Sequence, residues 1–340
     1  MKLASIFSAA KGKPANENSA AVWLVARGVA GFAVLWLLAY AVFRSFPYLT
    51  AGAEVVYQAK LRQEFSGQVF AANSNARRIL IFGDSRVLAG FIPSRFDTLA
   101  AADGLSVSSY NSGYPAVAEF VTQLKRIASN SAATPNILLL TMPWKSASKN
   151  FDPFHPLPDD HDIADRVFPF HFLIRDTASF FATAREHGGV QAFYRESREN
   201  EARMLRDRGY YFISEQSHFP NNRLPDTFHL DSDNPQWVFL RSADPESKEL
   251  ADLNAIILQH GIQCYYVPAY MRAGLAAAAP DVDEDFAALL QRYSSCKLLG
   301  PDYYLYPNHM FSDQNHLNSE GAAVYTEAIY RLLAQQLRER

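Results

Sequence analysis

The chain has 340 residues, of which 49% are hydrophobic, and a formal net charge of −3. A chain of this length and apolar content is expected to be globular and can hold one large α/β domain with extra segments. Lysine and arginine never form a block longer than two residues, so no basic face for nucleic acid is expected.

An apolar stretch near the N-terminus predicts a single membrane-spanning helix. A helix over residues 20–44 is long enough to cross the hydrocarbon layer of about 30 Å. Three lysines precede it, so the positive-inside rule places residues 1–19 in the cytoplasm and the rest of the chain outside. A cleaved signal peptide is the alternative, because Ala39-Tyr40-Ala41 resembles a cleavage site. Both interpretations lead to an extracytoplasmic domain.

A stalk and then an α/β domain are expected to follow. Residues 45–75 are interpreted as a largely helical stalk or linker, and residues 76–340 as the domain. Apolar runs that suit buried strands alternate with helical candidates there. The strands are predicted near 78–83, 106–110, 136–141, 262–267 and 297–299, and the helices at 116–130, 245–260, 282–293 and 318–338. This alternation predicts a three-layer αβα fold with a parallel sheet.

The first predicted strand ends in a turn with the sequence Gly83-Asp84-Ser85. Ser85 thus follows the carboxyl end of a buried parallel strand, where ligands bind in open α/β sheets. A serine hydroxyl needs a base to take its proton as it attacks, and a neutral imidazole suits this task. Asp313 lies three residues before His316, so its carboxylate can hold the imidazole in one tautomer. The three side chains predict a nucleophile, a base and an orienting acid.

These motifs resemble those of the SGNH (GDSL-type) hydrolases. Gly83-Asp84-Ser85 matches the first block of that superfamily, and Asp313-x-x-His316 matches the last. The resemblance implies an SGNH-hydrolase-like fold and an oxyanion hole made from the backbone N–H groups of Ser85 and Gly113. Gly113 ends the sequence Tyr110-Asn111-Ser112-Gly113, which fits the second block.

The third block departs from the family pattern. Family members commonly carry Gly-x-Asn-Asp after the third strand, whereas the strand predicted at 136–141 runs into Met142-Pro143-Trp144. The side-chain donor that the asparagine would supply is therefore missing from its usual place. Loss of one oxyanion donor typically costs about a hundred- to a thousand-fold in rate.

The N-terminal span together with these blocks is similar to bacterial envelope members of the superfamily. These include accessory proteins of teichoic acid D-alanylation and of alginate-type exopolysaccharide O-acetylation. The resemblance covers about residues 75–145 and 245–338. It implies a single-pass protein of the bacterial cytoplasmic (inner) membrane with a periplasmic catalytic domain. It also implies two partners, a membrane-bound O-acyltransferase and a glycan acceptor.

The segment at about 146–237 interrupts the alternation and is too long for a simple connection. It contains a helical candidate at 163–187. Two interpretations stay open. The segment is either an insertion that shapes an acceptor or partner surface over the active site, or an ordinary elaboration at the sheet edge.

Cys264 and Cys296 each lie at the start of a predicted strand. They can face one another if these strands are neighbours in the parallel sheet. A disulfide and two small buried thiols both stay open, and both are compatible with an extracytoplasmic domain.

Three functions are expected in order of preference. The first is an extracytoplasmic serine O-acyltransferase, in which Ser85 takes an acyl group, expected to be acetyl, and passes it to a glycan hydroxyl with His316 as base and Asp313 as orienting acid. The second is a carbohydrate or lipid esterase with the same triad. The third is a non-catalytic scaffold of a polysaccharide acylation or export complex. No cofactor and no metal are expected, because the histidines lack zinc-site spacing with a third ligand.

Overall fold

The chain divides into two units in the computed structural model. The first comprises residues 1–51 and 160–186, and the second comprises residues 52–159 and 187–340. The structure describes residues 15–45, 59–64, 66–70, 75–114, 120–141, 173–211, 217, 219–230, 233, 248–274 and 284–338.

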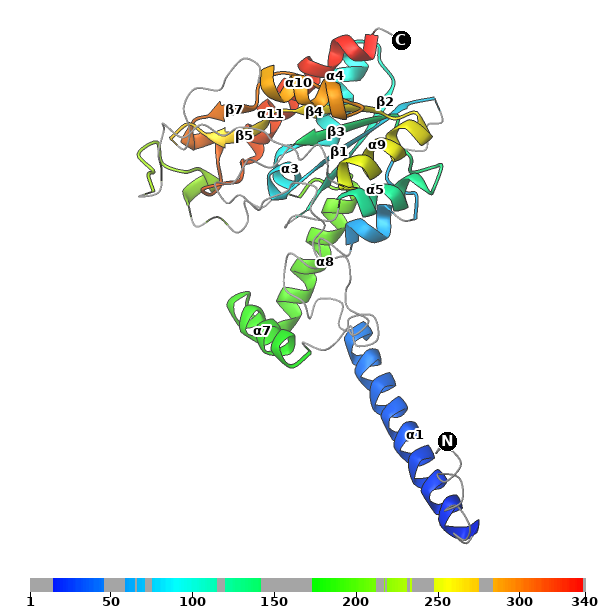
Figure 1. Ribbon diagram of the computed structural model, residues 1–340. Helices are drawn as coiled ribbons and strands as arrows, with labels where there is room; N and C mark the ends of the chain where they lie inside the picture. The colour runs from blue at the N-terminus through cyan, green and yellow to red at the C-terminus, as the bar shows by residue number, and fades with distance from the viewer. Residues whose placement is uncertain are drawn as a thin grey trace, which may run out of the picture. The chain divides into compact units, whose positions relative to one another are not determined.

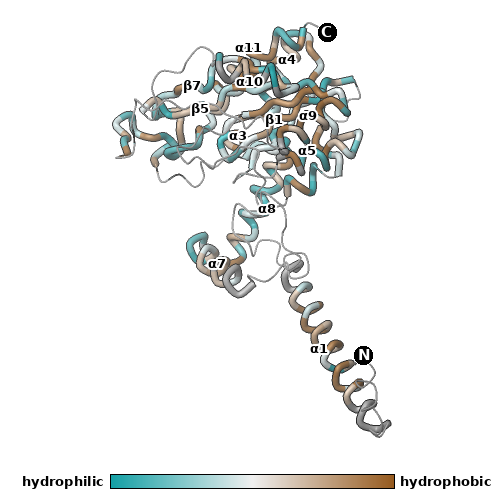
Figure 2. Tube along the Cα trace, viewed as in Figure 1, coloured by the Kyte–Doolittle hydropathy of each residue, from teal (hydrophilic) through white to brown (hydrophobic). Residues whose placement is uncertain are grey.

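The first unit contains helix α1 (Ala15–Ser45) and helix α7 (Leu173–Glu186). Within α1, the 21 residues Ala21–Ala41 are long and apolar enough to cross a membrane, and large apolar side chains such as Trp23 and Leu35 are exposed. Figure 2 shows the hydrophobic colouring along this helix. By length and composition, α1 can serve as a membrane span or as a signal sequence. Residues 1–14 lie outside the described residues.

The second unit is built on a five-stranded sheet with the order β2-β1-β3-β4-β6, and all four neighbouring pairs are parallel. The strands are β1 (Arg77–Gly83), β2 (Val107–Gly113), β3 (Ile137–Thr141), β4 (Gln263–Val267) and β6 (Cys296–Leu298). The chain moves from β1 to β2 on one side and then crosses to β3 on the other. The carboxyl ends of β1 and β3 therefore form a topological switch point, where such sheets bind ligands.

Helices cover both faces of this sheet, so the predicted three-layer αβα architecture is confirmed (Figure 1). The helices of the unit are α3 (Ser85–Gly90), α4 (Pro93–Ala102), α5 (Phe120–Ala128), α8 (Val190–Arg206), α9 (Lys248–His260), α10 (Glu284–Tyr293) and α11 (Ser319–Arg338). Alternate strand residues face opposite cores, as the strand period of two requires. Leu80 and Leu138 pack with α5 and α9, whereas Ile79 and Ile137 pack with α4 and α11.

A second, two-stranded sheet joins β5 (Ala269–Arg272) in parallel to β7 (Tyr303–Tyr306). It was not among the predicted strands. The aromatic residues of β7 suit a strand, but their register with β5 is set by pairing that is distant in sequence.

Cys264 and Cys296 are partners in the β4–β6 register and form a disulfide. The sequence left this bond open, because it depended on which strands are neighbours. Pairing of β4 with β6 brings the two Cα atoms to 4.4 Å, which is within reach of a disulfide.

The predicted stalk at 45–75 differs from the structure. The second unit begins at Gly52, and residues 59–64 form a helical turn whose Ala59, Lys60 and Glu64 are completely buried. Val69 also joins the core with Leu80. The described part of this segment therefore belongs to the folded domain, because it buries both apolar and charged side chains there.

The described part of the 146–237 segment packs against the domain at two places. After α8, the carbonyl of Arg208 accepts the N–H of Asn111 at the edge strand β2 (3.0 Å). Further on, Leu224 N donates to the Phe311 carbonyl (3.0 Å), and Ser217 Oγ donates to the Ser312 carbonyl (2.5 Å). The segment thus contacts the sheet edge and also the loop that precedes Asp313.

Candidate active site

Ser85 is the first residue of α3, directly after the turn that ends β1. Asp84 caps this helix, because its carboxylate accepts the N–H of Arg86 at 2.9 Å. The Arg86 guanidinium returns to the same carboxylate, with an Nη2–Oδ2 distance of 2.5 Å. Gly83 is required by close packing, since a Cβ there would lie 2.2 Å from Thr141 Oγ1. The strand end and the cap together fix the place of the Ser85 hydroxyl.

His316 joins Ser85 and Asp313 in one hydrogen-bonded relay. His316 Nε2 lies 2.9 Å from Ser85 Oγ, and His316 Nδ1 lies 2.8 Å from Asp313 Oδ2. The carboxylate can only accept at Nδ1, so this nitrogen carries the proton and Nε2 is left to accept the serine O–H. Ser85 and His316 are 231 residues apart in sequence. The structure therefore brings together the three residues that the sequence selected.

The loop that carries Asp313 and His316 is closed by its own backbone. Asp313 Oδ1 accepts the N–H groups of Asn315 and His316, both at 2.8 Å. Ser312 N donates to the His316 carbonyl at 2.8 Å, and Phe311 forms an isolated bridge with Leu317. The Asp-x-x-His spacing thus makes a tight turn in which one carboxylate serves the backbone and the imidazole.

Tyr270, on β5, connects the nucleophile helix to the histidine loop. Its hydroxyl donates to the Arg86 carbonyl at 2.9 Å and lies 3.5 Å from Leu317 N. Its ring packs edge-on against Phe311 and Tyr325. Sequence reasoning missed this residue, and the only signal was an aromatic side chain shortly after a buried strand.

Two ionised carboxylates lie near the imidazole. Burial alone would raise the pKa of Asp313, but hydrogen bonds from His316 and the charge of His316 outweigh burial and hold the pKa below its usual value. Burial likewise opposes ionisation of Asp84, yet the Arg86 guanidinium lowers its pKa. Asp313 is therefore ionised and can accept the Nδ1 proton of His316 throughout the reaction. The His316 side chain is 18% exposed, so solvent and substrate can reach the relay.

The two backbone N–H groups predicted as oxyanion donors differ in their hydrogen bonding. The N–H of Ser85 belongs to the first turn of α3, where helix N–H groups have no intrahelical partner. The N–H of Gly113 instead donates to Asn111 Oδ1 at 2.8 Å. A Cβ on Gly113 would lie 2.2 Å from Leu88 N, so this glycine allows α3 to pack on β2. Its role as an oxyanion donor stays a prediction and requires that the bond to Asn111 open.

The third family block cannot be placed, because Met142-Pro143-Trp144 lie outside the described residues. Over the part of the chain that the structure describes, no group of three or more His, Cys, Asp or Glu side chains could hold a metal ion. Ser85, His316 and Asp313 therefore form a candidate triad at the switch point of the sheet.

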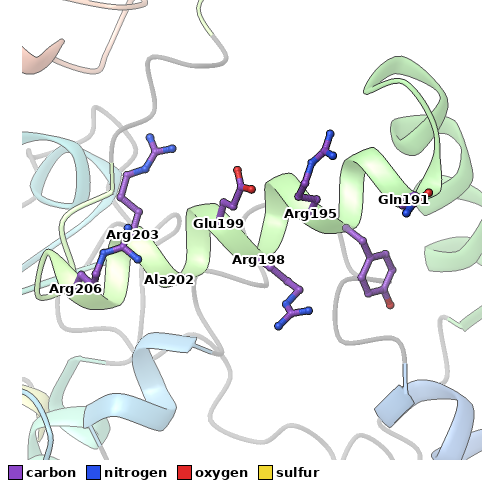
Figure 3. Close-up of a pocket in the computed structure, with 8 residues that line it drawn as sticks. Gln191, Arg195, Arg198, Glu199, Ala202, Arg203 and Arg206 are labelled. Atoms are coloured by element: carbon purple, nitrogen blue, oxygen red, sulfur yellow. The ribbon is translucent and has the colours of Figure 1, made fainter.

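A separate hollow lies beside α8, and Figure 3 draws the side chains that line it. It is lined by Gln191, Tyr194, Arg195, Arg198, Glu199, Ala202, Arg203 and Arg206. All these residues come from α8, and none belongs to the triad. Its arginine side chains give it a positive character.

Comparisons of the chain with models of known protein families, with curated proteins and with solved structures found no match. The fold class, an α/β domain with a parallel sheet and one N-terminal apolar helix, is compatible with an SGNH-like fold.

Proposed function

We propose that this protein is an extracytoplasmic serine O-acyltransferase of the SGNH type. The observation that carries the proposal is the relay from Ser85 Oγ through His316 to Asp313, with distances of 2.9 and 2.8 Å. Nucleophile, base and orienting acid stand in hydrogen-bonding order at the switch point of a parallel sheet, and this order is the signature of nucleophilic acyl transfer.

The first half-reaction acylates the serine. Ser85 Oγ attacks the carbonyl carbon of an acyl ester, while its proton moves to His316 Nε2. Asp313 stabilises the imidazolium through Nδ1. When the tetrahedral intermediate collapses, the bond to the leaving alcohol breaks and His316 returns the proton to that alcohol. The product is an ester on Ser85.

The second half-reaction uses the same side chains in reverse. A glycan hydroxyl gives its proton to His316 and attacks the carbonyl of the Ser85 ester. The bond between Ser85 Oγ and the acyl carbon then breaks, and His316 reprotonates the serine. If water takes the place of the glycan, the product is a carboxylic acid and the protein is an esterase.

The proposed location is the outer side of a bacterial cytoplasmic membrane, with α1 as the anchor and residues 1–19 in the cytoplasm. The apolar stretch Ala21–Ala41 supports an anchor, and the three lysines before it support this orientation. The Cys264–Cys296 disulfide supports an oxidising compartment. A membrane-bound O-acyltransferase is the proposed source of acyl groups, by resemblance to envelope proteins with this layout.

The test uses the full-length protein in detergent with p-nitrophenyl acetate, with and without an oligosaccharide acceptor. We expect p-nitrophenol release, acetyl on Ser85 by mass spectrometry, and acetylated oligosaccharide as product. Ser85→Ala should abolish all three. Ser94→Ala, an exposed serine on α4, is the matched control and should behave as wild type.

Two results would overturn parts of the proposal. Acetylation or ester cleavage that persists in Ser85→Ala excludes Ser85 as the nucleophile, whereas a wild-type protein without either activity leaves the scaffold role as the better explanation. Ester cleavage without any acetylated oligosaccharide, over a panel of neutral and acidic oligosaccharides, favours the esterase.

A further inference from the structure

A buried pair of ionisable side chains lies at the carboxyl end of β2, and the triad does not use it. Lys60 and Glu64 are both completely buried. Lys60 Nζ donates to the Gly209 carbonyl at 2.7 Å and lies 3.5 Å from Asn111 Oδ1. Both side chains come from residues 59–64, which follow the apolar helix in the chain.

The carboxylate of Glu64 holds the last residues of the strand. Ser112 Oγ donates to Glu64 Oε1 at 2.6 Å, and the Tyr114 hydroxyl makes a short hydrogen bond to Glu64 Oε2. Each carboxylate oxygen thus accepts one hydroxyl. Lys60 also lies over the Tyr114 ring, with Nζ 5.4 Å from the ring centroid.

Tyr114 also contacts the turn that carries Ser85. Its backbone N–H donates to the Gly83 carbonyl at 3.1 Å, and Gly83 is two residues before Ser85. Its neighbour Gly113 is the register partner of Gly83. A continuous path of hydrogen bonds therefore runs from Glu64 through Tyr114 to the end of β1.

A contribution to the stability of the fold does not by itself explain why Lys60 and Glu64 are buried here. Burial of two opposite charges costs several kcal/mol in desolvation, and well-packed apolar residues often do as well or better. The pair instead orients its neighbours, because Glu64 accepts hydrogen bonds from two hydroxyls and so fixes the side chains that carry them. Those side chains stand where β2 leaves the sheet beside Ser85.

We propose that Glu64 and Tyr114 are positioning residues of the acyl-transfer site. They fix the end of β2 relative to the turn that carries Ser85, and so they set the place of the groups that surround the reacting carbonyl. The inference rests on the proposed function. It also makes residues 59–64, which come after the apolar helix in the chain, a part of the active-site support.

Tyr114→Phe in the full-length protein tests the inference, because it removes only the hydroxyl that Glu64 holds. Tyr110→Phe is the matched control. The Tyr110 hydroxyl also contacts the 59–64 segment, through Gln63 Oε1 at 3.0 Å, but Tyr110 lies before the end of the strand. Each change removes one buried phenol hydroxyl that contacts the 59–64 helical turn.

The readouts are kcat and KM for p-nitrophenyl acetate, the rate of Ser85 labelling by a fluorophosphonate, and the thermal unfolding temperature. We expect Tyr114→Phe to lower kcat and the labelling rate about tenfold, a loss of about 1.4 kcal/mol in the transition state, with KM changed less than about twofold. Tyr110→Phe should keep kcat within about twofold of wild type at a similar unfolding temperature. Ser112→Ala, which removes the other hydroxyl on Glu64, repeats the test if Tyr114→Phe does not fold.

The outcomes separate the two proposals. If wild type cleaves the ester and is labelled at Ser85, but Tyr114→Phe and Tyr110→Phe change kcat equally, the positioning role is wrong and the proposed function stands. If wild type is neither active nor labelled, while Ser85→Ala is indistinguishable from it, the proposed function fails and the inference fails with it.

Discussion

Asp313 has two roles, one in the structure of its loop and one in the relay to His316. Its carboxylate closes the loop by accepting two backbone N–H groups, and it also accepts from His316 Nδ1. An asparagine could keep the backbone bonds through its carbonyl oxygen but has no negative charge for the imidazolium. Loop geometry and catalysis are therefore separable at this position.

Asp313→Asn should retain the fold and lose activity. We expect kcat for the ester to fall by about 10³- to 10⁴-fold, as happens when an orienting acid is replaced by its amide. The unfolding temperature should change little, because the loop keeps its backbone partners. Steady-state kinetics and thermal unfolding of the same preparation check this, and a kcat within tenfold of wild type would refute the role of Asp313.

Gly113→Ala tests the packing role of this glycine between β2 and α3. The alanine keeps the backbone N–H, but its Cβ would meet Leu88 N at 2.2 Å. We expect a loss of about 1 to 3 kcal/mol in the free energy of unfolding, as overpacking typically costs, together with lower activity as α3 moves. Urea denaturation measures the first effect. An unchanged free energy of unfolding would show that β2 and α3 have room to separate.

At the scale of residues, the sequence predicts the three residues of the triad but not the residues that hold their loops in place. Ser85, Asp313 and His316 carry their own signals, namely a strand-ending turn and a three-residue Asp–His spacing. Tyr270 and Glu64 have no such signal, because each acts through partners that only the fold brings near.

Elements were predictable where the strand pattern was strong. The alternation of buried strands with helices predicts the three layers of the fold. It does not predict which strands are neighbours, because this depends on the topology. The β5–β7 sheet was therefore missed. The sequence places residues 59–64 in a stalk, because the side chains of β2 that they contact are distant in sequence.

The Cys264–Cys296 disulfide between β4 and β6 should stabilise the folded protein. The two cysteines are 32 residues apart, and a disulfide over such a loop typically contributes about 2 to 4 kcal/mol by restricting the unfolded chain. The double variant Cys264→Ala/Cys296→Ala should lose this amount in urea denaturation. Reduced wild type should approach the double variant, and equal stability of oxidised and reduced wild type would contradict the expectation.

Lys60 should make stability depend on pH. Burial lowers the pKa of Lys60 to about 7, although the charge of Glu64 raises it. The unfolded lysine has a pKa of about 10.4, so the folded protein binds fewer protons between these values. Stability present above the unfolded pKa is thus lost as the pH falls towards 7. Tyr110 and Tyr114 stay neutral in this window, because burial raises the pKa of each well above its usual value.

The comparison is wild type against Lys60→Met by urea denaturation at about pH 7, 8.5 and 10. We expect the free energy of unfolding of wild type to fall relative to that of the variant as the pH decreases. A constant difference across the three pH values would mean that Lys60 does not titrate in this range.

At the scale of the whole molecule, the boundary of the domain lies earlier than the sequence indicated. The second unit starts at Gly52, and residues 59–64 supply the buried partners of Ser112 and Tyr114. Two shortened chains test this boundary, one that starts at residue 52 and one that starts at residue 75. The second leaves buried hydroxyls and the Gly209 carbonyl without their charged partners.

We expect the chain that starts at residue 75 to be less stable than the one that starts at residue 52 by about 3 kcal/mol or more, because each unpaired buried polar group costs about 1 to 3 kcal/mol. Urea denaturation of both chains measures the difference. Equal midpoints would show that the domain is complete without residues 52–74.

The contact of Arg208 with β2 has a further consequence for the protein in solution. An edge strand with free N–H and C=O groups is a template on which a second chain can add a strand. Here the Arg208 carbonyl occupies the Asn111 N–H, and Gly209 lies so close to Asn111 that a side chain would not fit. The turn after α8 therefore blocks sheet-to-sheet association of two copies at this edge.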